Sequence, residues 1–194
     1  MASLVLSGDT SGSITVSAPA VAGSTTQTLV NVTGTLAPIV SGTAVTCAGQ
    51  TSIDFTNIPS WVKRITVMLS GVSTSGTSAL QIQIGDSGGI ENTGYVSSAQ
   101  SSGTANGLTS GFSIGYTGFT AASTSSGVFI ISSLGSNTWL EFGNLTNSVT
   151  STVSASAGTK TLSDVLTQVR ITTVNGTDTF DTTPSAGTIN ILYE

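Results

Sequence analysis

The chain has 194 residues, which is enough for one domain with its own hydrophobic core, alone or with an extended arm. Charged residues make up only 7% of it, against about a quarter in an ordinary soluble domain, and its formal net charge is −5. With only four basic residues, it cannot form the cationic patch that binding to nucleic acid or to an anionic membrane surface requires.

A surface with so few charges does little to keep separate copies of the chain apart in solution. The low charge therefore raises the question of what covers the surface. It is either covered with hydroxyl groups or buried against other copies of the chain. No apolar run approaches the length of a transmembrane helix, and the first residues lack the basic start of a signal peptide. We therefore expect synthesis in the cytoplasm without an export signal.

The first 40 residues differ from the rest, because they carry almost no aromatic or charged residue. Weak strands are predicted near residues 3–6, 13–17 and 26–32, between glycines. The apolar content is too thin for a separate core, so this segment is either disordered or ordered by a partner. Alternating apolar residues favour the addition of its strands to another subunit. The residues expected to anchor this arm are Leu4, Leu6, Ile14, Val16, Leu29 and Val32.

From about residue 41 onward, apolar and polar residues alternate with the period of a β-strand. Strands are predicted at 43–47, 51–55, 63–69, 80–84, 93–98, 110–116, 128–131, 139–142, 148–154, 169–174 and 188–193. In the third of these, Ile65, Val67 and Leu69 share one face, whereas the continuous apolar run 128–131 predicts a strand buried on both faces. We expect an all-β fold, with an antiparallel, jelly-roll-like β-sandwich over 41–194 and an extended N-terminal β arm over 1–40.

Catalytic chemistry has little support, because the chain has no histidine. This absence removes the common triads, the cysteine–histidine pair and most zinc sites. The single cysteine, Cys47, is expected to be a small buried thiol. Two carboxylate pairs could still serve a glycosidase, but both lie in turns, where such side chains ordinarily cap the backbone. They are Asp86 with Glu91 and Asp178 with Asp181.

Asp178 and Asp181 could alternatively bind calcium, although their spacing matches no known calcium loop. We expect no enzyme activity, no cofactor and no metal. Three aromatic residues, Tyr95, Tyr116 and Phe119, lie in or near the Gly- and Ser-rich stretch 94–127. They either form an exposed surface that contacts a sugar or a protein, or fill the core from loop positions.

Several segments resemble a C-terminal module of phage tail-fibre, head-fibre and related virion proteins. The resemblance covers about three quarters of the chain, from residue 53 to residue 194. It rests on FTNIPSWVKRITV (55–67), LSGVST (69–74), QIQIG (81–85), ENTGY (91–95), VRITTVNGTDTFD (169–181) and GTINILYE (187–194). The first and last of these blocks are the more specific ones, and the Ser- and Gly-rich middle adds little.

The resemblance implies a β-sandwich displayed on a virion, commonly as a homotrimer, with the N-terminal part anchored to other virion proteins of the capsid or tail. Long fibres place such a module after an extended shaft, which this chain lacks. The resemblance therefore suits a short fibre, a capsid decoration or a small tail appendage. The alternative is a tip module of a tail fibre that binds a receptor or glycan on the host surface.

Overall fold

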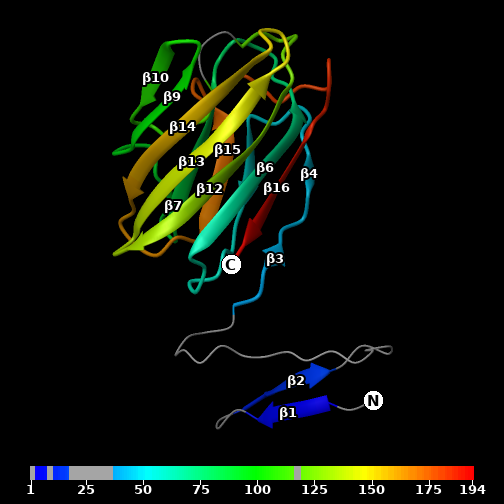
Figure 1. Cartoon of the computed structure of the whole chain (residues 1–194), viewed down its shortest axis with the longest axis vertical. Coiled ribbons are helices and arrows are strands. Elements are labelled where there is room, and N and C mark those ends of the chain that lie inside the picture. The colour runs from blue at the N-terminus through cyan, green and yellow to red at the C-terminus, as the bar shows by residue number, and fades with distance from the viewer. Residues whose placement is uncertain (1–2, 8–10, 18–36, 116–118) are drawn as a thin grey trace. The chain divides into compact units, whose positions relative to one another are not determined.

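The structure is a computed structural model that describes residues 3–7, 11–17, 37–115 and 119–194. It consists of two units, Met1–Leu36 and Ala37–Glu194, so the division falls close to the expected boundary at residue 40. The described residues form an all-β fold, as the alternation in the sequence predicts (Figure 1). They include no helix that could cross a membrane.

The first unit contains an antiparallel hairpin of β1 (Ser3–Ser7) and β2 (Ser13–Ser17). Both strands coincide closely with the strands predicted at 3–6 and 13–17. In this hairpin, Leu4 lies opposite Val16 and Leu6 lies opposite Ile14. The third predicted strand, 26–32, lies outside the described residues.

The second unit is a β-sandwich whose larger layer is an antiparallel sheet of nine strands. Across this sheet the strands follow the order β10 (Thr104–Leu108), β9 (Val96–Ser101), β14 (Thr152–Thr161), β13 (Thr138–Asn147), β12 (Ser125–Gly135), β6 (Arg64–Val72), β16 (Thr188–Tyr193) and β3 (Val40–Ser41), with β4 (Val45–Thr46) also paired to β16. The long strands β12, β13 and β14 form its middle and explain its length.

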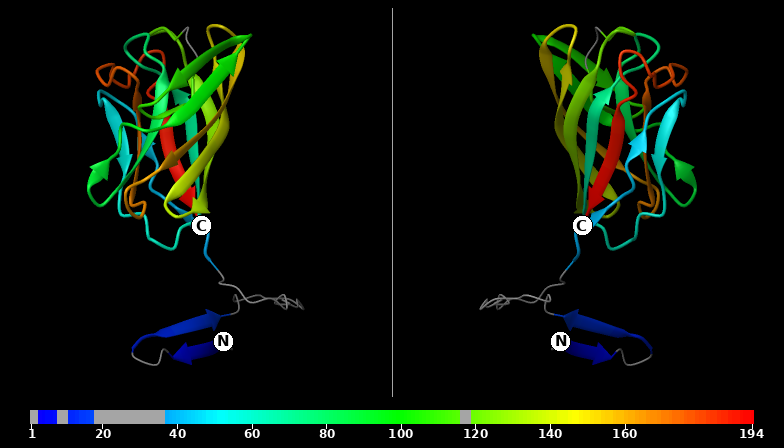
Figure 2. Two further views of the ribbon diagram at one scale, coloured as in Figure 1. Left: turned by 90° about the vertical axis from the view of Figure 1, so that its left-hand side faces the viewer. Right: turned by 90° about the vertical axis from the view of Figure 1, so that its right-hand side faces the viewer.

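The smaller layer is an antiparallel sheet of five strands that faces the larger one (Figure 2). Its strands follow the order β11 (Phe112–Ser113), β7 (Leu80–Asp86), β15 (Gln168–Thr173) and β5 (Ser52–Phe55), with β8 (Gly89–Ile90) paired to β7. Successive side chains along each strand point alternately toward the core and toward the outside, so each layer has one inner and one outer face.

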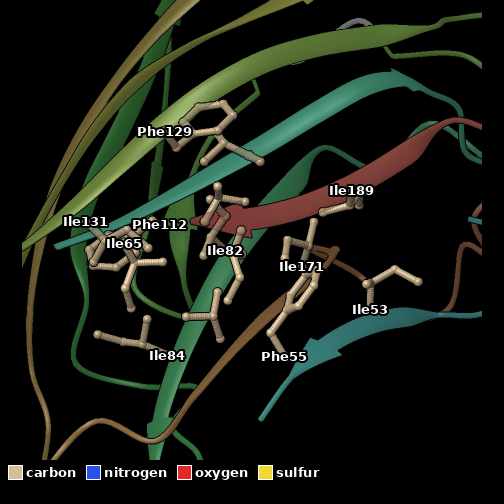
Figure 3. Packing of buried hydrophobic residues seen from close by; sticks show 14 of the residues in the cluster. Ile53, Phe55, Ile65, Ile82, Ile84, Phe112, Phe129, Ile131, Ile171 and Ile189 are labelled. Carbon is tan, nitrogen blue, oxygen red and sulfur yellow. The ribbon is translucent and has the colours of Figure 1, made fainter. Parts of the chain in front are cut away.

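The core lies between the two sheets, and the isoleucines of the period-2 segments supply much of it (Figure 3). Ile65 and Val67 of β6 face inward as predicted and have no exposed surface. They pack in one cluster with Ile82 of β7, Ile171 of β15 and other buried residues. Each such side chain contributes about 1.5–3 kcal/mol by leaving water, which is why the alternation alone predicts the sandwich.

The expectation for the apolar run 128–131 is wrong in one respect. Phe129 and Ile131 are fully buried, but Val128 is half exposed and Ile130 is only partly buried. The reason is that, among the described strands, only the five-stranded sheet packs against the sheet that contains β12, so alternate residues of β12 face outward. The apolar side chains that face outward are therefore not explained by the core of this chain.

Candidate interaction surfaces

Of the two alternatives for the aromatic residues of the stretch 94–127, the structure supports core filling for Tyr95 and Phe119 and not an exposed binding surface. Tyr95 is only 1% exposed, and its ring stands edge-on to Phe112 at a centroid distance of 5.0 Å. The Tyr95 hydroxyl accepts a hydrogen bond from the backbone N–H of Ile84 (2.8 Å) and donates one to the carbonyl of Glu91 (2.9 Å). Tyr95 therefore fills the core from a loop position.

Phe119 is likewise buried, and its ring packs directly on Gly115. A Cβ atom at Gly115 would lie 2.5 Å from the Phe119 ring, so only glycine leaves room for this contact. The third residue, Tyr116, lies outside the described residues. With two of the three rings inside the core, this set cannot form a binding surface.

The structure brings Asp86 and Glu91 together, one of the two carboxylate pairs considered for catalysis. The Ser163 hydroxyl lies 2.6 Å from Asp86 Oδ2 and 2.9 Å from Glu91 Oε1, and the Ser163 N–H donates to Glu91 at 2.7 Å. Buried Lys160 forms an ion pair with Glu91, and its Nζ lies 5.4 Å from the centroid of the Tyr95 ring. These contacts join the β7–β8 hairpin of one sheet to β14 and the loop after it.

The pKa shifts in this cluster do not suit acid catalysis. Hydrogen bonds, first from the Ser163 hydroxyl and then from the Gly88 N–H, lower the pKa of Asp86. Burial raises the pKa of Glu91, but Lys160 and Ser163 together lower it further than burial raises it. A glycosidase acid must hold a proton near neutral pH, which requires a raised pKa. Both carboxylates are instead ionised and held by internal donors, as in a structural clamp.

The second carboxylate pair caps loops of the backbone. Asp178 accepts hydrogen bonds from the Ser78 N–H (3.0 Å) and from the Asn175 side-chain amide (2.8 Å). Asp181 accepts bonds from the backbone N–H groups of the two residues that follow it. These are the ordinary turn contacts of aspartate. Within the described ranges, no group of three or more cysteine, aspartate or glutamate residues is placed to hold a metal ion.

Cys47 is fully buried, and burial raises the pKa of its thiol to about 11. A thiol with such a pKa stays protonated at neutral pH, and the thiolate is the reactive form of cysteine. Cys47 thus fits the expected role of a small buried residue.

A polar groove of about 270 Å³ crosses the outer side of the five-stranded sheet. Its floor includes Gln83 of β7, whose amide donates to the Ser110 carbonyl at 2.8 Å. Beside it, Arg170 of β15 forms two hydrogen bonds of 2.7 Å with Asp54 of β5. The sequence signal for this groove is the alternation of QIQI, which points two glutamines away from the core.

The hairpin of the first unit exposes apolar side chains. Val5, Leu6 and Val16 are each more than half exposed. Each of the two strands has one neighbour, and no further strand among the described residues pairs with either. The side chains of Leu4 and Ile14, and both Leu29 and Val32, lie outside what the structure describes. Two of the six expected anchoring residues, Leu6 and Val16, are thus seen to be available for contact.

A second exposed apolar surface lies on the nine-stranded sheet. We call it the outer face: the side chains of β9, β14, β13, β12, β6 and β16 that point away from the five-stranded sheet. Phe142 is its largest side chain and is 55% exposed. On either side of Phe142 lie Ile130 of β12 and Ala157 of β14, its register partners. Sequence reasoning missed this surface because the apolar run 128–131 was expected to be buried on both faces.

The candidate interaction surfaces among the described residues are therefore the two exposed apolar surfaces and the polar groove, while the carboxylate pairs of the sandwich make internal contacts. Comparison of the chain with family models, curated proteins and solved structures finds no match. What the chain does must accordingly be inferred from its own residues and from the geometry of these surfaces.

Proposed function

We propose that this chain is a non-enzymatic structural component of a phage particle: a short fibre, a capsid decoration or a small tail appendage. Its N-terminal arm anchors it to a capsid or tail protein, and its sandwich is exposed on the virion. The observation that carries this proposal is the division of the chain into an apolar hairpin unit and a sandwich with a complete core. The resemblance of residues 53–194 to virion modules supports the choice of particle.

The hairpin is suited to anchoring because it is not a stable structure by itself. An isolated pair of strands is at best marginally stable in water, and this pair exposes Val5, Leu6 and Val16. Open strand edges offer unpaired N–H and C=O groups to a neighbouring sheet, so a strand of a partner can extend the hairpin. Main-chain hydrogen bonds would then supply affinity, and the apolar side chains would supply contact area.

A structural role also agrees with the internal contacts of the acidic residues. Asp86 and Glu91 are held as carboxylates by Ser163 and Lys160, and Asp178 caps a loop. The chain has no histidine that could act as a general base in their place. These side chains stabilise the sandwich, and none of them is a good candidate for proton transfer.

Deletion of residues 1–36 tests the anchoring role. The remaining unit, Ala37–Glu194, contains every residue of the buried cluster, so we expect it to fold and to unfold cooperatively on heating. We also expect it to be absent from particles that incorporate the full chain. Circular dichroism measures the first property, and co-sedimentation with particles assembled in producing cells measures the second.

A full-length control tests whether incorporation requires the exposed apolar side chains of the arm or only the presence of the arm. The double substitution Leu6→Asp and Val16→Asp keeps the length of the chain and places charges on the exposed hairpin. It should reduce incorporation as the deletion does. Particles that incorporate the truncated, folded chain as well as the full chain would refute the anchoring role of the arm.

The polar groove favours a second candidate function, in which the exposed sandwich binds a host-surface glycan. Sugars are recognised by fixed amide, hydroxyl and guanidinium groups, and Gln83 and Arg170 are such groups held by partners within the chain. Asn92 lies exposed at the edge of the groove, so Asn92→Ala should weaken glycan binding without affecting the fold. A glycan array probed with both proteins decides this; equal signals, or none for either protein, would count against the groove.

A further inference from the structure

The outer face of the nine-stranded sheet carries apolar side chains on three adjacent strands along its middle row. In this row the cross-strand register runs from Ala157 of β14 to Phe142 of β13, then to Ile130 of β12 and Thr66 of β6. The rows on either side add exposed Leu140 and exposed Val128. A cluster of large exposed apolar side chains ordinarily marks a surface that another protein covers.

The distribution of charge on the sandwich indicates what covers this face. Most acidic residues of the second unit lie on the five-stranded sheet or in loops, namely Asp54, Asp86, Glu91, Asp164, Asp178 and Asp181. The remaining two are Glu141, which is buried inside, and Glu194, which pairs with Arg64 at the end of the outer face. Two copies with a net charge of −5 would therefore repel each other least when their outer faces meet.

The extent of the face also fits such a contact. β13 has ten residues, so the face is about 34 Å long, and the six strands span about 24 Å across. The resulting area of about 800 Å² equals what each partner contributes to a protein interface of standard size. Arg64, which pairs with Glu194, is the one charged side chain among those that the described strands of this face point outward. A second copy would therefore match the face in polarity better than a highly charged partner would.

We propose that the outer face packs against the outer face of a second copy of this chain, with Phe142 near the centre of the contact. The pairing brings two sheets together face to face, as in the core of a β-sandwich, at a separation of about 10 Å. It goes beyond the proposed function, because it concerns the sandwich alone and requires no particle.

The mass of the full chain in solution tests this pairing, measured by light scattering over a dilution series. At high concentration we expect a mass equal to two chains, and on dilution we expect it to fall to the mass of one chain. Phe142→Glu should raise the dissociation constant at least about 100-fold, because the new carboxylate would be buried without a partner. The matched control is Val165→Glu, which makes the same kind of change at an exposed residue in the loop after β14 and should leave the mass unchanged.

Thiol labelling gives a second test that does not depend on the folding of the Phe142 variant. The native cysteine, Cys47, is buried, and Ala157 is exposed on the outer face. The thiol of an Ala157→Cys variant is therefore the accessible one. This thiol should react slowly in the dimer and faster on dilution. The control is Thr56→Cys, at an exposed residue that follows β5 of the other sheet, and its thiol should react at the same rate at every protein concentration. Three results would overturn the pairing: a single chain at every concentration, a dimer that Phe142→Glu leaves intact, or labelling of Ala157→Cys that does not change on dilution.

Discussion

Tyr95→Ala should lower the free energy of unfolding of the sandwich by about 4 kcal/mol, the usual cost of removing a buried aromatic side chain. The ring is enclosed by Phe112 and Lys160, and its loss would leave a cavity between the two layers. It would also leave the N–H of Ile84 without its hydrogen-bond acceptor. Chemical denaturation followed by circular dichroism measures the change.

Tyr95→Phe separates the hydroxyl group from the ring. Because the ring remains, we expect a loss of only about 1–2 kcal/mol, from the unpaired N–H of Ile84 and the unpaired carbonyl of Glu91. A ligand-binding tyrosine on the surface would give a different result, since exposed substitutions usually change stability by less than about 0.5 kcal/mol. A loss of that size in Tyr95→Ala would show that the ring is not part of the core.

The strands and their inner faces could be predicted because burial and alternation determine them locally. Ile65 and Val67 face the core for the same reason that makes their segment a strand: every second residue is apolar. The burial of the Tyr95 ring in the core could not be predicted from alternation. It depends on contacts with Phe112 and with the backbone of Ile84, which the fold alone brings together.

The strand β10 was also not predicted, because TANGL has one large apolar residue and resembles a loop. It forms because its backbone pairs with β9, which already lies in the sheet. The clamp of Asp86, Glu91 and Ser163 joins residues more than 70 positions apart, so the sequence suggested the two carboxylates but not their shared partner.

The orientation of β13 shows a conflict between local pattern and packing. In the segment WLEF, apolar content alone would favour Leu140 and Phe142 inside, yet both face outward. The inward side carries Trp139, Gly143 and Leu145 instead. Phe129 packs so closely on Gly143 that a Cβ atom there would lie 2.4 Å from its ring. This packing fixes the register of the strand.

One consequence of that register is that Glu141 points into the core, where it is 2% exposed. Its Oε1 accepts a hydrogen bond of 2.7 Å from the Ser156 hydroxyl, and no donor among the described residues reaches Oε2. Burial outweighs this hydrogen bond and raises the pKa of Glu141 to about 7, from an ordinary value of 4.5. The charged form is therefore costly in the folded state.

The direction of the pH dependence follows from this shift. Because the folded state holds the proton more tightly than the unfolded state, unfolding releases it between about pH 4.5 and pH 7. The stability that protonated Glu141 provides is complete below pH 4.5 and is lost as the pH rises through 7. At pH 8 the cost of the carboxylate is about 3 kcal/mol.

Glu141→Gln should therefore raise the free energy of unfolding, relative to wild type, by about 3 kcal/mol more at pH 8 than at pH 4. Glutamine resembles the protonated acid in shape, so comparing the two pH values cancels any constant effect of its amide. Glu91→Gln is the matched control with the opposite sign, because Lys160 and Ser163 hold the pKa of Glu91 below its ordinary value. That substitution should destabilise the protein at pH 8 more than at pH 4. If Glu141→Gln changes stability equally at both pH values, then Glu141 is not a buried acid with a raised pKa.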